Sequence, residues 1–105
     1  MDIAEWRKQI DELDKRLVEL INQRARAAKE IGRLKRNTSL PIYEPDREKQ
    51  IFENISQLNQ GPLSDKLLFQ IYERLIDVMR RLQTIDSEQK EKKAGETELE
   101  AEIND

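Results

Sequence analysis

The 105-residue chain contains neither cysteine nor histidine. Without cysteine it has no disulfide, no thiolate nucleophile, and no zinc finger or iron–sulfur cluster. Without histidine it lacks both the usual proton shuttle at neutral pH and the commonest metal ligand. Any catalysis must therefore rest on carboxylates, amides, hydroxyls and cations, and we expect neither a metal nor another cofactor.

Glycine, proline and aromatic residues are scarce, with three glycines, three prolines and five aromatic side chains. A β-sandwich or β-barrel needs many turns, so this composition disfavours both folds. No apolar run is long enough to span a membrane, and the first residues lack the basic and then apolar pattern of a secretory signal. We therefore expect an all-α, cytoplasmic protein that does not bind membranes.

Charged residues make up 39% of the chain and are unevenly distributed. Residues 86–105 hold eight carboxylates against three lysines, a net charge of −5, which leaves +2 on residues 1–85 out of a total of −3. Leu99 and Ile103 are the only large apolar residues of this tail, too few to offset the chain entropy lost on folding. We expect a helical domain over residues 1–85 and a disordered tail over residues 86–105.

A heptad pattern runs through the first third of the chain. With Ile3 at position a, nine of the ten a and d positions up to Leu34 are apolar. This pattern predicts one very long N-terminal helix over residues 3–36, roughly 50 Å long at 1.5 Å per residue. Turn-forming residues from Asn37 to Ser39, followed by Pro41, predict where this helix ends.

Two shorter helices are predicted after the first. Pro45 suits the first turn of one helix, which Gly61 and Pro62 end. Ser64 is a suitable N-cap for another helix, whose apolar stripe runs to Leu82. Helices of about 15 and 20 residues cannot cover the apolar seam of a 50 Å helix. We therefore expect this seam to pair with the same helix of a second copy in a helical homodimer.

Arg24 occupies the one a position that is not apolar. A single polar residue at such a position can set helix register, or its charged end can extend to the surface. However, Lys35 lies three turns further on, within roughly 20° of the same helix face. Two cations on the inward face favour an anionic ligand held between helices. Nucleic-acid binding is not expected, because these cations face the seam and form no outward stripe.

Three groups of residues have a distinctive order and spacing. They are Arg7-x-x-Ile10-Asp11-x-Leu13-Asp14-x-x-Leu17, then Arg24, Ala28, Gly32 and Lys35, and then Pro41-Ile42-Tyr43-Glu44-Pro45-Asp46-Arg47-Glu48. Together they resemble the all-helical chorismate mutases over roughly residues 4–84. The resemblance implies a three-helix protomer in an intertwined homodimer that converts chorismate to prephenate on the route to phenylalanine and tyrosine.

That reaction is an intramolecular [3,3] rearrangement without proton transfer or a covalent intermediate, which agrees with the absence of histidine and cysteine. The resemblance implies that Arg7 and Arg24 hold the two carboxylates of the substrate, chorismate, because guanidinium binds carboxylate bidentately. It further implies that Lys35 and Gln83 contact the ether oxygen, where negative charge develops as the C–O bond breaks.

Four further positions take roles from the same resemblance. Arg47 matches another substrate-binding arginine, and Glu48 matches the carboxylate that receives the ring hydroxyl. Glu44 falls where the family often has aspartate and uses mainly the backbone. Met79 departs from the family, which often has a small hydroxyl residue there. That replacement removes one neutral hydrogen bond, typically worth about 1 kcal/mol.

Arg7 is too far along its helix to serve the same site as Lys35. The two residues are 28 positions apart, about 42 Å along a helix. An antiparallel partner helix would bring its own Arg7 to the Lys35 end, so we expect each protomer to donate Arg7 to its partner's site. Two alternatives stay open: an isochorismate–pyruvate lyase on the same fold, and a non-catalytic dimerisation module. The sequence also leaves open whether the chain was excised from a larger fused enzyme.

Overall fold

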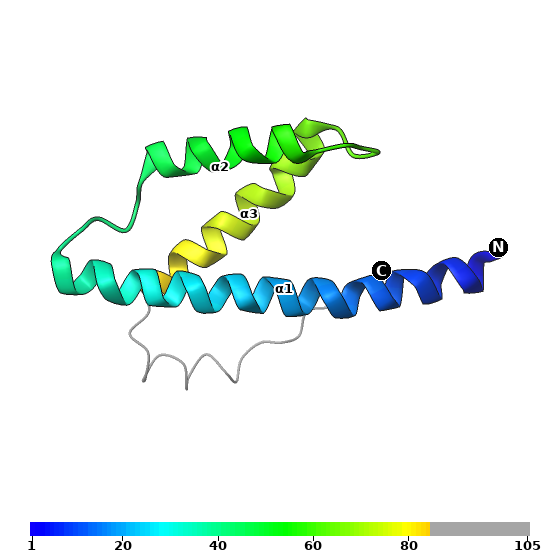
Figure 1. The fold of residues 1–105 in the computed structure, drawn as a ribbon, viewed down its shortest axis with the longest axis horizontal. Helices are drawn as coiled ribbons and strands as arrows, with labels where there is room; N and C mark the ends of the chain where they lie inside the picture. Colours follow the sequence, from blue (N-terminus) through cyan, green and yellow to red (C-terminus); the bar gives the residue numbers. More distant parts are fainter. Residues whose placement is uncertain (85–105) are drawn as a thin grey trace.

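The computed structural model describes residues 1–84, so the tail expected over residues 86–105 lies outside the described part. These described residues form three helices: α1 (Ile3–Thr38), α2 (Pro45–Leu58) and α3 (Asp65–Thr84). No strand occurs within residues 1–84, which confirms the predicted all-α protomer with a very long N-terminal helix. In Figure 1, α2 lies apart from α1, and α3 runs diagonally from the far end of α2 back to α1.

Both ends of α1 follow from its sequence. At the start, the Asp2 carboxylate accepts a hydrogen bond from the backbone N–H of Glu5, and the Glu5 carboxylate accepts one from the N–H of Asp2, each at 2.9 Å. This reciprocal arrangement is a capping box, which satisfies two N–H groups that the helix leaves unpaired. At the other end, Ser39 adopts a left-handed conformation with φ 63°. This conformation ends the helix within the predicted turn-forming segment.

The connection between α2 and α3 is held by side chains. Helix α2 ends at Leu58, earlier than the predicted stop at Gly61, because the Asn59 side chain accepts a hydrogen bond from the Gly61 N–H at 3.0 Å. Such local bonds offer the backbone an alternative to another helical turn. The Asp65 carboxylate accepts hydrogen bonds from Asn59 at 2.8 Å and from the Ser56 hydroxyl at 2.7 Å. The end of α2 is thereby tied to the start of α3.

Helix α3 begins as the sequence predicts and joins the other two helices. The Ser64 hydroxyl accepts a hydrogen bond from the Leu67 N–H at 3.2 Å, which confirms Ser64 as the N-cap. Helix α3 packs against both α1 and α2, whereas the backbones of α1 and α2 do not pack against each other within the described residues. The small apolar core consists of Ala28, Ile55, Ile76 and Met79.

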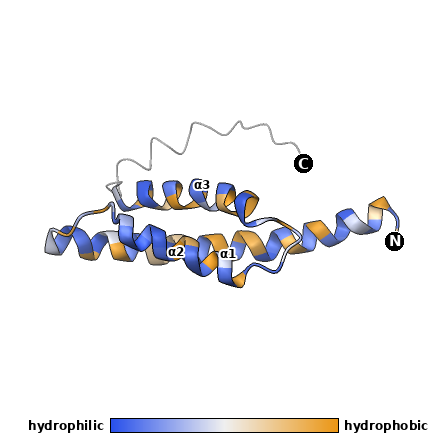
Figure 2. Cartoon of the chain, turned by 90° about the horizontal axis from the view of Figure 1, so that it is seen from above, coloured by the Kyte–Doolittle hydropathy of each residue, from blue (hydrophilic) through white to orange (hydrophobic). Residues whose placement is uncertain are grey.

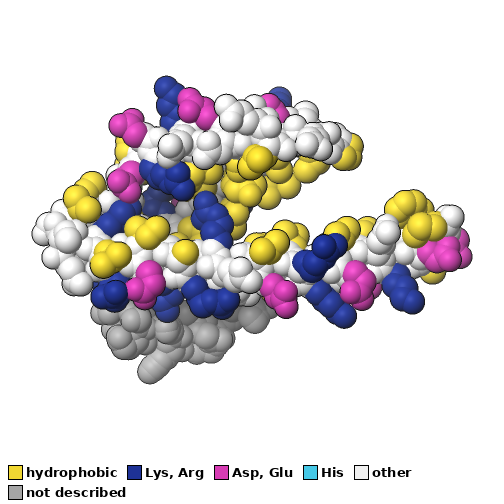
Figure 3. Space-filling view, in the orientation of Figure 1, with side chains coloured by type: hydrophobic (Ala, Val, Ile, Leu, Met, Phe, Trp, Pro, Cys, Tyr) yellow, Lys and Arg dark blue, Asp and Glu magenta, His cyan; other side chains and the backbone are white. Residues whose placement is uncertain are grey.

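The apolar seam of α1 stays exposed over its N-terminal half. Six large side chains there are 49 to 69% exposed: Ile3, Trp6, Ile10, Leu13, Leu17 and Leu20. Figure 2 shows α1 continuing toward its N-terminus beyond α2 and α3, and Figure 3 shows hydrophobic side chains along this extension. No helix within residues 1–84 is long and apolar enough to cross a membrane. A continuous exposed row of this kind marks an interaction surface.

Asp65 makes the stability of the fold depend on pH. Hydrogen bonds from Asn59 and Ser56 lower the pKa of the Asp65 carboxyl below its ordinary value of 3.8. Such a carboxyl stabilises the fold above its unfolded-state pKa and loses that contribution as the pH falls through its folded-state pKa. We therefore expect Asp65→Asn to be less stable than the wild type at neutral pH, and the difference to shrink below about pH 4.

Urea unfolding across this pH range measures the effect. Asp46→Asn is the matched control, because Asp46 also lies in the first turn of a helix but forms no side-chain hydrogen bond to the described residues. A constant difference between the wild type and Asp65→Asn from neutral to acidic pH would contradict this account.

Candidate active site

A cavity of about 390 Å³ lies between α1, the start of α2 and the C-terminal half of α3. This volume is typical of small-molecule sites. Its walls are aliphatic, and its polar lining consists of Arg24, Lys35, Glu44, Arg47, Glu48, Arg80 and Gln83. Figure 3 shows cationic side chains gathered in the hollow between α1 and α2.

The charge of the cavity favours an anion. Four cations and two carboxylates line it, which leaves a charge of +2, although the whole chain carries −3. The aliphatic walls lower the local dielectric, so these charges act more strongly on a bound molecule than they would in water. The cavity therefore suits a small molecule with an apolar body and two negative charges.

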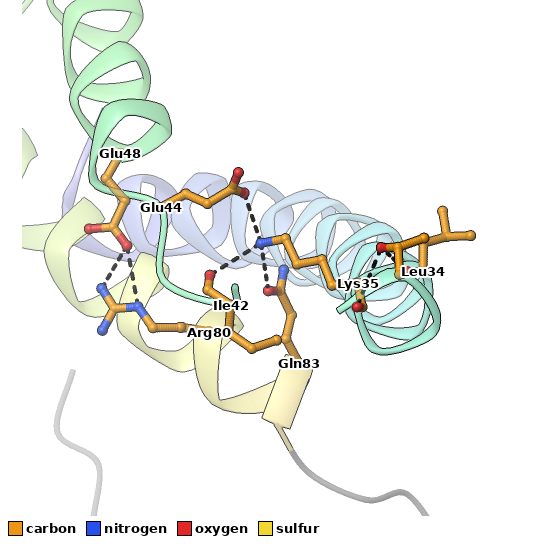
Figure 4. Close-up of polar contacts among 8 residues, drawn as sticks. Leu34, Lys35, Ile42, Glu44, Glu48, Arg80 and Gln83 are labelled. Atoms are coloured by element: carbon orange, nitrogen blue, oxygen red, sulfur yellow. Dashed lines mark hydrogen bonds and ion pairs between the residues drawn. The ribbon is translucent and has the colours of Figure 1, made fainter. Parts of the chain in front are cut away.

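Lys35 is the most deeply buried charge of the cavity, with an exposed fraction of 7%. Its Nζ lies 2.8 Å from Oε1 of Glu44, and it donates hydrogen bonds to the Ile42 carbonyl at 3.1 Å and to Oε1 of Gln83 at 3.4 Å (Figure 4). Three acceptors match the three donors of an ammonium group and offset the cost of burying it. A ligand oxygen that reaches Nζ must replace or share one of them.

Gln83 is held beside Lys35 by close packing of α3 on α1. A Cβ atom at Gly32 would lie 2.9 Å from both Cα and Cβ of Gln83, so a larger residue at Gly32 would push the last turn of α3 away. Arg36 reinforces the contact, because its Nη1 donates a hydrogen bond to the Gln83 carbonyl at 2.8 Å. This bond caps a carbonyl that the helix end leaves unpaired.

Glu48 and Arg80 form an ion pair on another side of the cavity. Both Nε and Nη2 of Arg80 donate to Oε2 of Glu48, at 3.2 and 2.7 Å (Figure 4). The guanidinium carbon lies 5.0 Å from the centre of the Tyr43 ring, which adds a cation–π contact. The hydrogen bonds to Glu48 raise the pKa of Arg80 further above its ordinary value. Arg80 therefore stays charged throughout the physiological range.

Seven of the eight site residues proposed from the sequence line this one cavity: Arg24, Lys35, Glu44, Arg47, Glu48, Met79 and Gln83. Arg47 donates to Gln50 at 2.7 Å, and Arg24 has no ion-pair partner among residues 1–84. Arg7 does not line the cavity, because about 42 Å of continuous helix separates it from Lys35.

The chain matches a known protein family. A model of chorismate mutase type II matches residues 6–84. The chain is 38% identical over 86 residues to the bifunctional chorismate mutase/prephenate dehydratase of Aquifex aeolicus, covering 78% of this chain and 24% of that protein. It is 34% identical over 82 residues to the chorismate mutase of Methanocaldococcus jannaschii, covering 77% of this chain and 83% of that protein. The chain belongs to the type II chorismate mutase family.

Solved chorismate mutases have the same fold. Form II of the Thermus thermophilus enzyme aligns with a TM-score of 0.78 at 27% identity, covering 82% of this chain and 98% of that one. The Helicobacter pylori enzyme in complex with prephenate aligns with a TM-score of 0.70 at 28% identity, covering 91% and 97%. The chain spans about a quarter of the length of the bifunctional Aquifex relative.

Arg80 is the one polar residue of the cavity lining that was not predicted from the sequence. It precedes Gln83 by three positions, a spacing that puts both side chains on neighbouring parts of one helix face. That signal was weak because the adjacent Arg81 carries the same charge. In the structure the two arginines differ in burial: the Arg80 side chain is 34% exposed, whereas that of Arg81 is 66% exposed.

Substitution of Arg24 tests whether its charge is needed for ligand binding in the cavity or for the stability of the fold. Since it has no ion-pair partner among the described residues, Arg24→Leu removes a desolvation cost from an otherwise apolar helix face. We expect the melting temperature to stay the same or rise while most of the chorismate turnover that the family resemblance predicts is lost. Calorimetry and a chorismate assay measure the two effects. Arg26→Leu is the control, because Arg26 is exposed on the same helix and does not line the cavity. Lower stability with normal turnover would show that Arg24 is structural.

Proposed function

We propose that this chain catalyses the intramolecular rearrangement of chorismate to prephenate without a cofactor. The observation that carries this proposal is the buried Lys35 ammonium, which meets the Gln83 amide inside an aliphatic cavity of charge +2. Membership of the type II chorismate mutase family supports the rearrangement over the isochorismate–pyruvate lyase reaction and over a non-catalytic dimerisation module.

Lys35 and Gln83 would stabilise the transition state at the ether oxygen of chorismate. As the C–O bond breaks, negative charge develops on that oxygen, and a fixed ammonium in a low-dielectric cavity favours it. Because the Gln83 amide oxygen accepts from Lys35, the amide nitrogen is the donor left for the ether oxygen. Neither residue needs to transfer a proton, so the chemistry requires no group that titrates near neutral pH.

The arginines would hold the substrate in a compact conformation. Arg24 on α1 and Arg47 on α2 approach the cavity from different helices. Guanidinium groups bind carboxylates bidentately and stay charged, so cations on different walls can hold the two carboxylates of chorismate at a fixed separation. Holding reacting atoms together in this way removes much of the entropy cost of an intramolecular rearrangement.

Glu48 and Glu44 would contribute in different ways. Arg80 binds Oε2 of Glu48, so Oε1 is the atom available to accept the ring hydroxyl of chorismate. The Glu44 side chain is 46% exposed, and it can swing away from Lys35 toward solvent when the ether oxygen arrives. The backbone of Glu44 would then remain as its contact with the substrate.

We further propose that the working enzyme is an antiparallel homodimer. The exposed row of large apolar side chains from Ile3 to Leu20 provides the surface for a second copy of α1. An antiparallel copy would place the partner's Arg7 at the cavity, where it would supply the remaining arginine for a substrate carboxylate. In this arrangement Arg7 would serve a site although it lies far from the Lys35 of its own chain.

Turnover of chorismate tests the proposed reaction. Loss of chorismate ultraviolet absorbance should follow addition of the protein, with isochorismate as the alternative substrate in a parallel assay. Lys35→Ala should lower the rate by about 100-fold or more, the cost typical of removing one donor to a developing oxyanion. Lys35→Arg should fall between Lys35→Ala and the wild type, because its charge is kept but its shape is wrong. Lys29→Ala, at an exposed position of α1, serves as control. Equal rates for Lys35→Ala and wild type would remove Lys35 from the mechanism.

Mixing two inactive variants tests the shared site. In a dimer of one Arg7→Ala chain and one Arg24→Ala chain, one site receives both arginines and the other receives neither. Random re-pairing makes about half of the dimers mixed, so refolding an equal mixture should restore roughly a quarter of wild-type activity. Mixtures that stay as inactive as either parent, although mass spectrometry shows subunit exchange, would refute the shared site.

A further inference from the structure

Arg80 links three separate parts of the chain at the edge of the cavity. It projects from α3, pairs with Glu48 in the first turn of α2, and lies against the Tyr43 ring in the segment before α2. Because α1 and α2 do not pack against each other within the described residues, the start of α2 depends on such side-chain contacts for its position over the cavity.

The contact with Arg80 fixes the orientation of the Glu48 carboxylate. Both hydrogen bonds from Arg80 end on the same carboxylate oxygen, Oε2, so they orient the carboxylate and leave Oε1 for another donor. The guanidinium is itself restrained by the Tyr43 ring and by Asp77, whose Oδ1 lies 3.7 Å from Nη1 of Arg80. The Arg80 and Glu48 side chains are 34% and 23% exposed, so solvent only partly screens the pair.

We propose that Arg80 is a positioning residue, which holds the Glu48 carboxylate so that Oε1 faces the ring hydroxyl of the substrate. This inference rests on the proposed chorismate mutase function. It gives Arg80 a role that acts through Glu48 and not through contact with substrate. A bidentate contact of the Nε and Nη2 edge with a substrate carboxylate would require both donors to leave Glu48, while Nη1 lies on the side of Asp77, 3.7 Å from its Oδ1. The present hydrogen bonds and the Tyr43 contact oppose that movement.

Steady-state kinetics of three variants test the inference. We expect Arg80→Met to lower kcat/KM about tenfold, the scale of one lost charge-assisted hydrogen bond. Arg80→Lys should recover part of this loss, because an ammonium can still donate to Oε2. Arg81→Met is the matched control: it makes the same change at the neighbouring, more exposed position, outside the cavity, and should leave kcat/KM within about twofold of wild type.

A double-mutant cycle then shows whether Arg80 acts through Glu48. In a Glu48→Gln background, Arg80→Met should cause little further loss, because the carboxylate that Arg80 orients is already gone. If the two losses multiply in full, Arg80 acts independently of Glu48 and the proposal is overturned. A full effect of Arg80→Met with no recovery in Arg80→Lys would likewise overturn it, since carboxylate positioning needs a charged donor.

Arginine side-chain NMR gives a readout that needs no turnover. The Nε–H resonance of Arg80, assigned by its disappearance in Arg80→Lys, should shift in Glu48→Gln and move less in Asp77→Asn. An unmoved resonance in Glu48→Gln would show that the pair does not form, even in an active enzyme. An inactive wild type that still shows the shift would instead overturn the proposed function, and with it the role of Arg80 in catalysis.

Discussion

The buried ammonium of Lys35 is the interaction on which the site depends. Lys35 has an exposed fraction of 7%, so its ammonium must be surrounded by acceptors, and it takes them from two segments, the loop between α1 and α2 and the end of α3. The Ile42 carbonyl comes from the loop after α1, the Glu44 carboxylate from the residue before α2, and the Gln83 amide from the end of α3. Helices α1 and α2 do not pack directly within residues 1–84, so this one group draws together parts of the chain that the apolar core leaves apart.

The local sequence around Lys35 serves this convergence. Gly32 lies one turn earlier and allows the backbone of α3 to approach α1 closely enough for Gln83 to reach the ammonium. Arg36, the next residue, holds the Gln83 carbonyl at 2.8 Å. Three positions within five residues of α1 therefore determine where α3 ends. A glycine in a helix interior costs stability, roughly 0.5–1 kcal/mol relative to alanine. In this protein glycine is required at position 32, because any side chain there would prevent the close approach of α3 to α1.

Most of the fold could be predicted from the sequence because its determinants are local. The heptad pattern, Pro45 and Ser64 set the helices, and Arg24 and Lys35, which their i to i+11 spacing puts on one helix face, line one cavity. What could not be predicted depends on tertiary neighbours or on side-chain reach. Helix α2 ends early because Asn59 bonds to the loop, and Arg80 becomes part of the site through a carboxylate 32 positions earlier. Neither partner follows from helical periodicity alone.

The pairing of Glu44 with Lys35 affects substrate binding and the chemical step differently. In the structure the ammonium has a carboxylate 2.8 Å away. In the proposed reaction this carboxylate gives way to the neutral ether oxygen of chorismate, so the ammonium exchanges an anionic partner for a weaker one in the ground state. As the C–O bond breaks, the same oxygen becomes negative and restores a charge-assisted contact. The interaction is then stronger in the transition state than in the substrate complex, which is the condition for accelerating the chemical step. The displacement of Glu44 costs the same in the substrate complex and in the transition state, so it weakens substrate binding, and the acceleration comes from the charge that develops on the oxygen.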